Sequence, residues 1–197
     1  GCDQQSSRES GTSSKDTLDS ASLDVSWSYQ EGKSTALSMP PEVVGDSMVL
    51  YSNNVRLLAL GFEEGALIWR SPQLDPLRDI SAVDLVVDGS QAFASHSGKI
   101  IAWSLHSGEV QWTFSPPNDE DVWENGYYGS GPNYFYAFNY GRKVLVIEKN
   151  SGTLARTWTL ELPPAGATFS SESLYIAQSF TPEGAEGQRR GGVLKVD

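Results

Sequence analysis

Four tryptophans divide this sequence at nearly equal intervals. Trp27, Trp69, Trp112 and Trp158 follow one another after 42, 43 and 46 residues. A period of roughly 40–45 residues indicates one supersecondary unit of about four strands, repeated along the chain. Because one such unit cannot bury its apolar faces alone, each unit must pack against its neighbours.

The text between the tryptophans repeats as well. Residues 88–114 divide into a strand at 91–95, a turn at Ser97-Gly98, a strand at 99–105, a turn at Ser107-Gly108 and a strand that ends at Trp112. Glycine adopts the positive φ of tight hairpin turns without strain, and asparagine tolerates it. The pattern therefore predicts antiparallel hairpins joined by two-residue turns.

The neighbouring units divide in the same way. The unit before has turn residues at Asn53-Asn54 and Glu64-Gly65, the unit after has them at Gly141 and Ser151-Gly152, and a fourth unit supplies two more strands. Since no segment shows helical apolar periodicity, we expect an all-β fold. The prediction is a β-propeller of four-stranded antiparallel blades over residues 24–197, with about four repeats and one tryptophan wedged after each outer strand.

The first 23 residues differ in composition from the repeats. They are rich in serine, aspartate and glutamine, and their only large apolar side chains are Leu18 and Leu23. Such a segment buries too little apolar surface to offset its ordering entropy, so we expect a disordered tether over residues 1–23. The single cysteine, Cys2, follows Gly1 at its start. A Gly-Cys pair before a polar tether resembles the cleavage point of a bacterial lipoprotein signal, which would make Cys2 a lipidated membrane anchor.

The charge of the chain limits its partners. A net charge of −11 with scattered lysine and arginine argues against nucleic acid, whose phosphates require clustered basic residues. The one notable basic pair, Arg189-Arg190, lies among glycines and is interpreted as a solvated turn.

The strand, Gly-turn, strand, Ser-Gly-turn and Trp order of GKIIAWSLHSGEVQW and GRKVLVIEKNSGTLARTW resembles the quinoprotein-like (PQQ-type) propeller repeat. Together with the tether and Cys2, it resembles the propeller lipoproteins of the outer-membrane β-barrel assembly machinery. The resemblance implies seven or eight blades. Four repeats then mean a complete small ring, a part of a longer propeller, or a half-ring that pairs with another copy. DVSWSY, residues 24–29, matches an outer strand, and together with GGVLKVD at residues 191–197 it would complete one shared blade.

No catalytic, metal or cofactor residues are predicted. Quinoprotein dehydrogenases with this repeat are expected to hold their cofactor with Ca²⁺ and, in many members, a disulfide of adjacent cysteines, which this sequence lacks. His96 and His106 have no converging partner in the sequence, and no nucleophile elbow or phosphate loop is present. The acidic loop at 116–125 is interpreted as a solvated loop or partner contact, because its spacing fits no EF-hand.

The aromatic run after that loop is the predicted partner surface. Tyrosine and tryptophan are enriched at protein interfaces, so the candidate residues are Asp119, Asp121, Trp123, Tyr127, Tyr128 and Tyr134. The resulting hypothesis is a non-catalytic protein-interaction scaffold of the bacterial periplasm, anchored by lipid to the outer or inner membrane and binding an envelope protein. The alternatives are a fragment of a quinoprotein dehydrogenase and a propeller that binds carbohydrate or another small ligand.

Overall fold

The structure is a computed structural model in which every described element is a β-strand. It describes residues 25–29, 40–52, 56–74, 85–96, 98–117, 127–138, 142–170, 173–180 and 190–196. The whole predicted tether, including Cys2, lies outside these ranges, as do Asp119, Asp121 and Trp123. No helix is present in the described part of the chain, and the fifteen strands form four antiparallel sheets. The predicted all-β propeller class is confirmed.

The sheets follow the chain in order, with sequential strands as neighbours. The first sheet contains β1 (Glu42–Val44), β2 (Met48–Ser52), β3 (Leu57–Gly61) and β4 (Leu67–Arg70). The second contains β5 (Val86–Asp88), β6 (Gln91–His96), β7 (Lys99–Ser104) and β8 (Val110–Phe114). The third contains β9 (Tyr127–Ser130), β10 (Tyr134–Phe138), β11 (Lys143–Glu148) and β12 (Leu154–Thr159). The fourth contains β13 (Pro164–Phe169), β14 (Leu174–Phe180) and β15 (Arg190–Val196).

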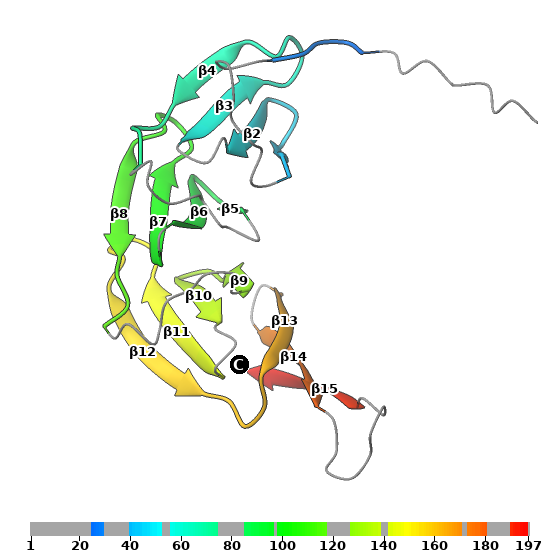
Figure 1. The fold of residues 1–197 in the computed structure, drawn as a ribbon, viewed down its shortest axis with the longest axis vertical. Coiled ribbons are helices and arrows are strands. Elements are labelled where there is room, and N and C mark those ends of the chain that lie inside the picture. Colours follow the sequence, from blue (N-terminus) through cyan, green and yellow to red (C-terminus); the bar gives the residue numbers. More distant parts are fainter. Residues whose placement is uncertain are drawn as a thin grey trace, which may run out of the picture.

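The four sheets are arranged as blades around an arc that stays open (Figure 1). The first strands β5, β9 and β13 lie on its inner side, and the outer strands β4, β8 and β12 follow its convex side. Within the described residues, β15 has β14 as its only neighbour in the sheet. The predicted shared blade of residues 24–29 and the last strand is therefore not formed in this structure.

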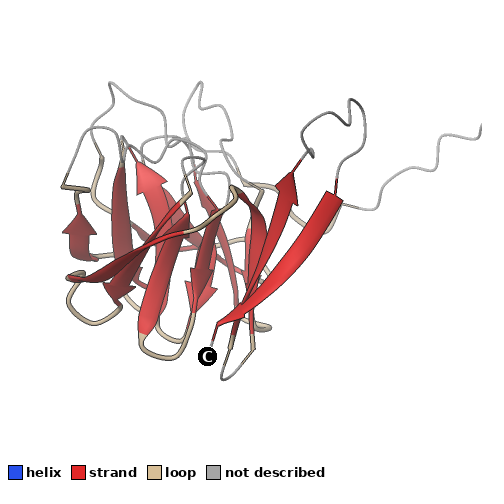
Figure 2. Cartoon of the chain, turned by 90° about the horizontal axis from the view of Figure 1, so that it is seen from below, coloured by secondary structure: helices blue, strands red, loops and turns tan. Residues whose placement is uncertain are grey.

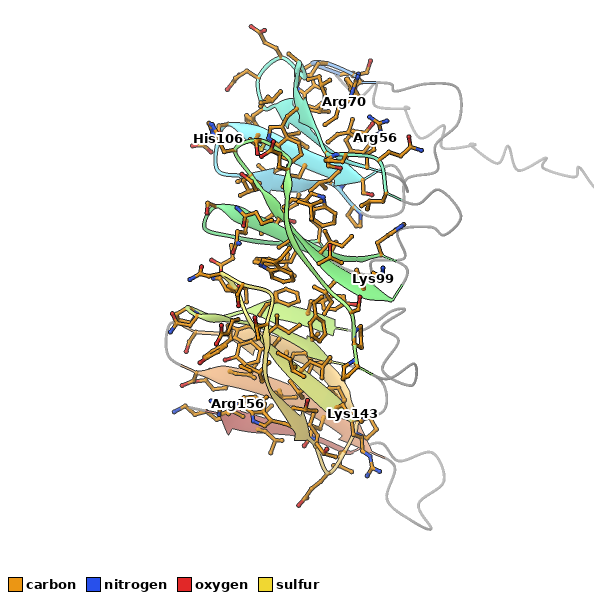
Figure 3. The ribbon with its side chains drawn as sticks, turned by 90° about the vertical axis from the view of Figure 1, so that its left-hand side faces the viewer. Arg56, Arg70, Lys99, His106, Lys143 and Arg156 are labelled. Atoms are coloured by element: carbon orange, nitrogen blue, oxygen red, sulfur yellow. The ribbon has the colours of Figure 1, made fainter. Side chains whose placement is uncertain are left out.

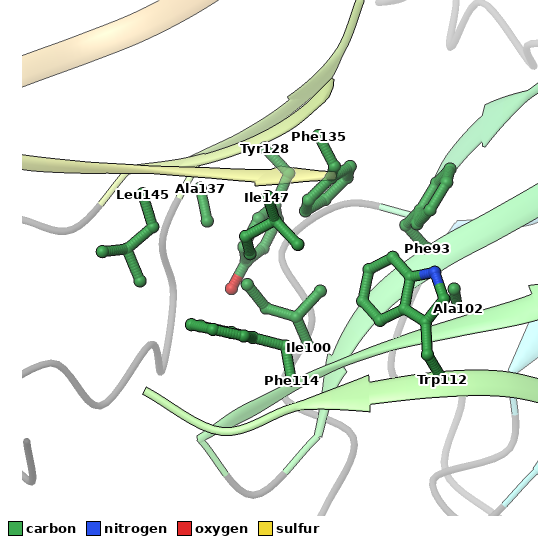
Figure 4. Packing of buried hydrophobic residues seen from close by; sticks show 10 residues of the cluster. All are labelled: Phe93, Ile100, Ala102, Trp112, Phe114, Tyr128, Phe135, Ala137, Leu145 and Ile147. Carbon is green, nitrogen blue, oxygen red and sulfur yellow. The ribbon is translucent and has the colours of Figure 1, made fainter. Parts of the chain in front are cut away.

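The core lies between successive sheets, because a blade is covered on both faces. One buried cluster joins the first and second sheets around Trp69 and Trp103, and another joins the second and third around Phe93 and Phe135. In Figure 4, the side chains of the second cluster point from facing strands into one layer. The phenyl rings of Phe93 and Phe135 stack with centroids 4.7 Å apart.

The first three of the four repeat tryptophans are each seated on a turn of the sheet that follows: the indole packs against the turn glycine, and its N–H donates to a backbone carbonyl of the same turn. Trp27 Nε1 donates to the carbonyl of Phe62 at 2.9 Å, Trp69 Nε1 to Leu105 at 2.8 Å, and Trp112 Nε1 to Lys149 at 2.7 Å. A Cβ on Gly65, Gly108 or Gly152 would overlap the indole that lies against it. Trp69 and Trp112 thus lie between successive sheets, whereas residues 25–29, which contain Trp27, belong to no sheet among the described strands.

These turns are longer than the two-residue turns that the sequence predicted. In the second sheet, the amide of Gly108 donates to Ser104, four residues earlier, at 2.8 Å, while Ser104 donates to Glu109 at 2.9 Å. Only the glycine has a positive φ, +73°. The same pair of bonds recurs at Gly65 and Gly152. The additional residues create the flat seat for the indole, and several described turns lie along the lower rim in Figure 2.

Trp158 does not occupy the position of the other repeat tryptophans. Trp69 pairs with Ala59 and Trp112 with Ala102, but the residue in register with the equivalent Val146 is Arg156. Trp158 lies two residues further along β12, opposite Val144. Trp158 still lies between two sheets, because it packs against a buried cluster of the third and fourth sheets. Its position differs because the last outer strand reaches its tryptophan six residues after its turn glycine instead of four.

Candidate functional site

An open cleft lies between the third and fourth sheets, at the place where the earlier interfaces are closed. Its cavity volume is about 270 Å³. We name it the aromatic cleft and define it by Tyr134, Tyr136, Arg156, Trp158 and Phe169, which all line it.

Tyr136 lies at the centre of the aromatic cleft. Its ring centroid is 5.0 Å from that of Phe169 on β13 and 5.9 Å from that of Trp158 on β12. Tyr134 meets Tyr136 edge-on, with centroids 6.4 Å apart. Offset and edge-on contacts of this kind favour a fixed aromatic surface. Burial and the neighbouring Tyr134 raise the pKa of the Tyr136 phenol, while Arg156 lowers it. Since the net shift is upward, the phenol stays protonated at neutral pH and can donate a hydrogen bond.

Arg156 supplies the positive charge of the aromatic cleft. Its guanidinium carbon lies 5.9 Å from the centroid of the Trp158 ring, within cation–π range. In Figure 3 it lies on the opposite side of the sheets from Lys143, Lys99 and Arg56, which stand at or just before the start of each third strand. The cleft therefore offers stacking faces, one guanidinium fork and two phenols, a set suited to a polypeptide segment with a carbonyl or carboxylate.

The structure places the predicted partner residues in different environments. Tyr134 lines the aromatic cleft, and its role in a partner surface stays a prediction. Tyr128 does not contribute to a surface, because it is only 7% exposed and stacks on Phe135 with centroids 5.8 Å apart. Tyr127 lies at the start of β9, and its side chain is outside the described residues. The cleft residues Tyr136, Arg156 and Phe169 were not predicted as site residues.

A polar tie closes the neighbouring interface between the second and third sheets. The ammonium of Lys149 and the hydroxyl of Ser130 both donate to Asp88 Oδ2, and Lys149 also donates to the carbonyl of Gly131 at 3.0 Å. Burial alone would raise the pKa of Asp88, but the hydrogen bonds from Lys149 and Ser130, together with the charge of Lys149, outweigh it and hold that pKa below its usual value of 3.8. This tie is a structural link between blades.

The described residues do not fit the Ca²⁺ of a quinone cofactor. They contain no group of three or more histidine, cysteine, aspartate or glutamate side chains that could hold a metal ion. His96 is buried in β6 and His106 is exposed in the following turn. The described part of the chain contains no helix that is long and apolar enough to span a membrane.

The stacked four-stranded sheets and the repeated tryptophan seats define a propeller built from PQQ-like repeats. A family model described as "Outer membrane protein assembly factor BamB" matches residues 9–128, and the chain belongs to this family. The outer membrane protein assembly factor BamB of Alkalilimnicola ehrlichii is 23% identical over 129 residues, which cover 61% of this chain and 32% of the relative. The chain spans between 20% and 32% of the length of the curated relatives that it matches.

Two solved structures share the fold. The computationally designed Ika4 protein gives a TM-score of 0.59 at 12% identity, over 86% of this chain and 96% of its own. The quinohemoprotein alcohol dehydrogenase ADHIIG of Pseudomonas putida HK5 gives a TM-score of 0.56 at 17% identity, over 79% of this chain and 30% of its own. At these identities the similarity establishes the propeller fold alone.

Proposed function

We propose that this chain is a non-catalytic protein-interaction scaffold of the bacterial cell envelope that takes part in the assembly of outer-membrane proteins. The observation that carries the proposal is the aromatic cleft, which offers the rings of Tyr134 and Trp158 and the guanidinium of Arg156 to a polypeptide and borders β15. Membership in the BamB family supports the assembly role.

The partner segment is an extended strand. A strand at the edge of a sheet can pair with an added strand, and main-chain hydrogen bonds along such an edge supply affinity without a specific sequence. Since β15 borders the aromatic cleft, it is the strand that we propose to pair with the partner. Outer-membrane barrel segments alternate apolar and polar side chains. Such a strand would place its apolar side chains beside one of the two exposed apolar residues of β15, Val193 or Leu194, which point to opposite faces, while Arg156 and Trp158 contact its neighbouring turn or side chains.

The remaining parts of the proposal concern location and chemistry. The proposal includes a periplasmic location and a lipid anchor on Cys2, for which the resemblance of Gly1-Cys2 and the polar tether to a processed lipoprotein is the support. The non-catalytic role predicts that the quinone cofactor with Ca²⁺ leaves the melting temperature unchanged, because only a ligand that binds the folded state raises it.

Amide hydrogen exchange with a defined peptide tests the binding mode. A ten-residue peptide with alternating apolar and polar residues should slow exchange in β15, whereas a scrambled peptide of the same composition should not. With Trp158→Ala, at least tenfold more peptide should be needed to slow exchange in β15 to the same extent. The control Phe62→Ala truncates an exposed aromatic ring next to β3 and should leave the required peptide concentration unchanged. Equal protection of all sheets by both peptides would refute strand capture at β15.

A further inference from the structure

Equivalent positions on the lower rim can be compared sheet by sheet. In each of the first three sheets, one backbone hydrogen bond joins the turn after the third strand to the residue before the second strand. These bonds run from Phe62 to Ser47, from Leu105 to Ser90 and from Lys149 to Asn133, at 3.1, 2.8 and 3.1 Å. They define which four residues surround the same point of the rim in each sheet.

The third sheet fills these four positions with longer hydrogen-bonding side chains than the other two. The first sheet has Ser47, Met48, Gly61 and Glu63. The second sheet has Ser90, Gln91, Ser104 and His106. The third sheet has Asn133, Tyr134, Glu148 and Asn150. Because the first two sheets form the same turn with other residues, the fold does not require these four side chains.

The four residues of the third sheet line an open hollow of about 160 Å³, which we name the rim hollow. They belong to β10, β11 and the adjoining turns, so the hollow lies within one complete four-stranded sheet. Tyr134 also lines the aromatic cleft, whereas Glu148 and Asn150 do not. Pockets for drug-sized ligands measure about 300–1,000 Å³, so the rim hollow suits a ligand of a single ring.

Most of the hydrogen-bonding capacity in the rim hollow is unused. Within the described part of the chain, the side-chain amides of Asn133 and Asn150 and the phenol of Tyr134 form no hydrogen bond. In the second sheet, by contrast, the amide of Gln91, equivalent to Tyr134, donates to the carbonyl of Lys149 at 3.2 Å. The third sheet therefore presents its polar groups to solvent at a position where the second sheet turns them inward.

The carboxylate of Glu148 is held in place by its own turn. The hydroxyl of Ser151 donates to Glu148 Oε2 at 3.0 Å, and the amide of Thr153 donates to Ser151 Oγ at 3.2 Å. This arrangement orients the carboxylate and leaves Oε1 to accept a hydrogen bond from a ligand. A preoriented acceptor loses less side-chain entropy on binding than a mobile one.

We propose that the rim hollow binds one neutral sugar ring through a pair of adjacent hydroxyls. Each sugar hydroxyl both donates and accepts, which matches two amides, a phenol and a carboxylate. Tyr134, which meets Tyr136 edge-on with centroids 6.4 Å apart, supplies a fixed aromatic ring for the apolar C–H face of the sugar. The ammonium of the neighbouring Lys149 is bound to Asp88, so the hollow offers a carboxylate without a basic partner. Phosphorylated and acidic sugars are therefore disfavoured.

NMR titration of the full 197-residue chain tests the proposal. The probes are methyl glucoside, methyl galactoside and methyl N-acetylglucosaminide, which differ in the orientation of one hydroxyl or in one substituent. We expect at least one of them to shift the side-chain amide signals of Asn133 and Asn150 saturably, with a dissociation constant of about 1–10 mM for so small a ligand. Sorbitol has adjacent hydroxyls but no ring, and it should give no saturable shift.

Substitutions locate the site. Asn150→Ala and Glu148→Gln change exposed residues, and each should weaken sugar binding about fivefold or more, because each removes one hydrogen-bond partner or its charge. Tyr134→Ala should weaken it at least as much through loss of the ring. His106→Ala is the matched control, since His106 is the exposed residue at the equivalent turn position of the second sheet, and it should leave sugar binding unchanged.

Two results would overturn the proposal. The first is that none of the three sugars gives a saturable shift of the Asn133 and Asn150 signals. The second is a shift that Asn150→Ala and Glu148→Gln leave unchanged, which would mean that the sugar binds elsewhere. The inference is independent of strand capture at β15. Asn150→Ala should therefore leave the protection of β15 by the alternating peptide unchanged, and loss of both activities in this folded variant would refute a separate sugar site.

Discussion

The interface between the second and third sheets and the interface between the third and fourth are built from the same repeat but differ in closure. In the first, Trp112 is seated on Gly152, and Phe93 stacks on Phe135. In the second, Arg156 takes the place of the wedge, and the aromatic cleft stays open. The same repeat unit thus forms a closed interface in one place, and in the next an interface that keeps an open cleft beside its buried cluster. The predictions below test this difference, from the largest expected effect to the smallest.

The largest difference in stability between the two interfaces should appear when an aromatic ring is truncated in each of them. Phe135→Ala removes a fully buried ring between the second and third sheets, and we expect it to lower the free energy of unfolding by about 3–5 kcal/mol. Phe169→Ala removes a partly exposed ring from the aromatic cleft and should cost about 1 kcal/mol. Urea denaturation followed by circular dichroism measures both. Equal losses would mean that the cleft is packed as tightly as the closed interface.

Substitution of the seat glycine should be the next largest effect. Gly152 has a φ of +69°, and a Cβ there would overlap the indole of Trp112. Gly152→Ala should therefore cost about 2–3 kcal/mol, which combines backbone strain with displacement of the indole.

Gly89 provides the matched control for that substitution. Its φ is +58°, but no atom lies within 4 Å of the Cβ position. Gly89→Ala should cost only about 1 kcal/mol, the strain term alone. If thermal unfolding showed the same loss for both variants, the close approach of the indole would contribute nothing.

Removal of one indole N–H should distinguish a seated from an unseated tryptophan. Trp112→Phe deletes the hydrogen bond to Lys149 and leaves its carbonyl with fewer donors, so we expect a loss of about 1–1.5 kcal/mol. Trp158 has no such carbonyl acceptor among the described residues. Trp158→Phe should therefore change the free energy of unfolding by less than about 0.5 kcal/mol. Chemical denaturation measures both losses. A larger loss of unfolding free energy for Trp158→Phe would mean that the Trp158 N–H makes a hydrogen bond to a buried carbonyl, contrary to the open cleft in the structure.

The polar tie should have the smallest effect and a defined pH dependence. The pKa of Asp88 in the folded chain lies below the usual 3.8, so its contribution is present above that value and is lost as the pH falls through the folded pKa. Asp88→Asn should cost about 0.5–1 kcal/mol at neutral pH, because the pair is partly solvent-screened.

Urea unfolding at about pH 7 and about pH 2.5 checks the sign. The difference between Asp88→Asn and the native chain should be present at the higher pH and shrink at the lower one. A difference that grew on acidification would mean that Asp88 is protonated in the folded chain, contrary to its contacts with Lys149 and Ser130.

The sequence predicted the blades because the repeat encodes their geometry directly. Gly65, Gly108 and Gly152 mark turns that only a residue with free φ can make, and the tryptophans before them were readable from the spacing. The spacing did not show that Trp158 has another position in the register, because a shift of two residues along the strand changes the interval between tryptophans only slightly. Nothing in the composition of residues 164–169 indicated the strand β13.

The candidate site was harder to predict, because both faces of a blade are covered. In a sheet with one wet face, strand alternation separates buried from exposed side chains. Tyr128 and Phe135 lie on the third sheet, in the cluster that joins it to the second sheet. Because this sheet has a neighbouring sheet on each face, strand alternation indicates which sheet a ring faces but does not indicate whether the ring is exposed. The position of Arg156 in the aromatic cleft depends on strand register, which only the structure shows.

The tryptophan seats also determine the order in which parts of the chain can finish folding during translation. Each indole is seated on a carbonyl that lies 35, 36 or 37 residues later in the sequence. At about 5–20 residues per second, a ribosome delivers the seat about 2–7 seconds after the indole. While the repeats are being synthesised, the most recent repeat tryptophan of the nascent chain therefore lacks its carbonyl acceptor. Each sheet completes its contacts only after the next sheet has left the ribosome.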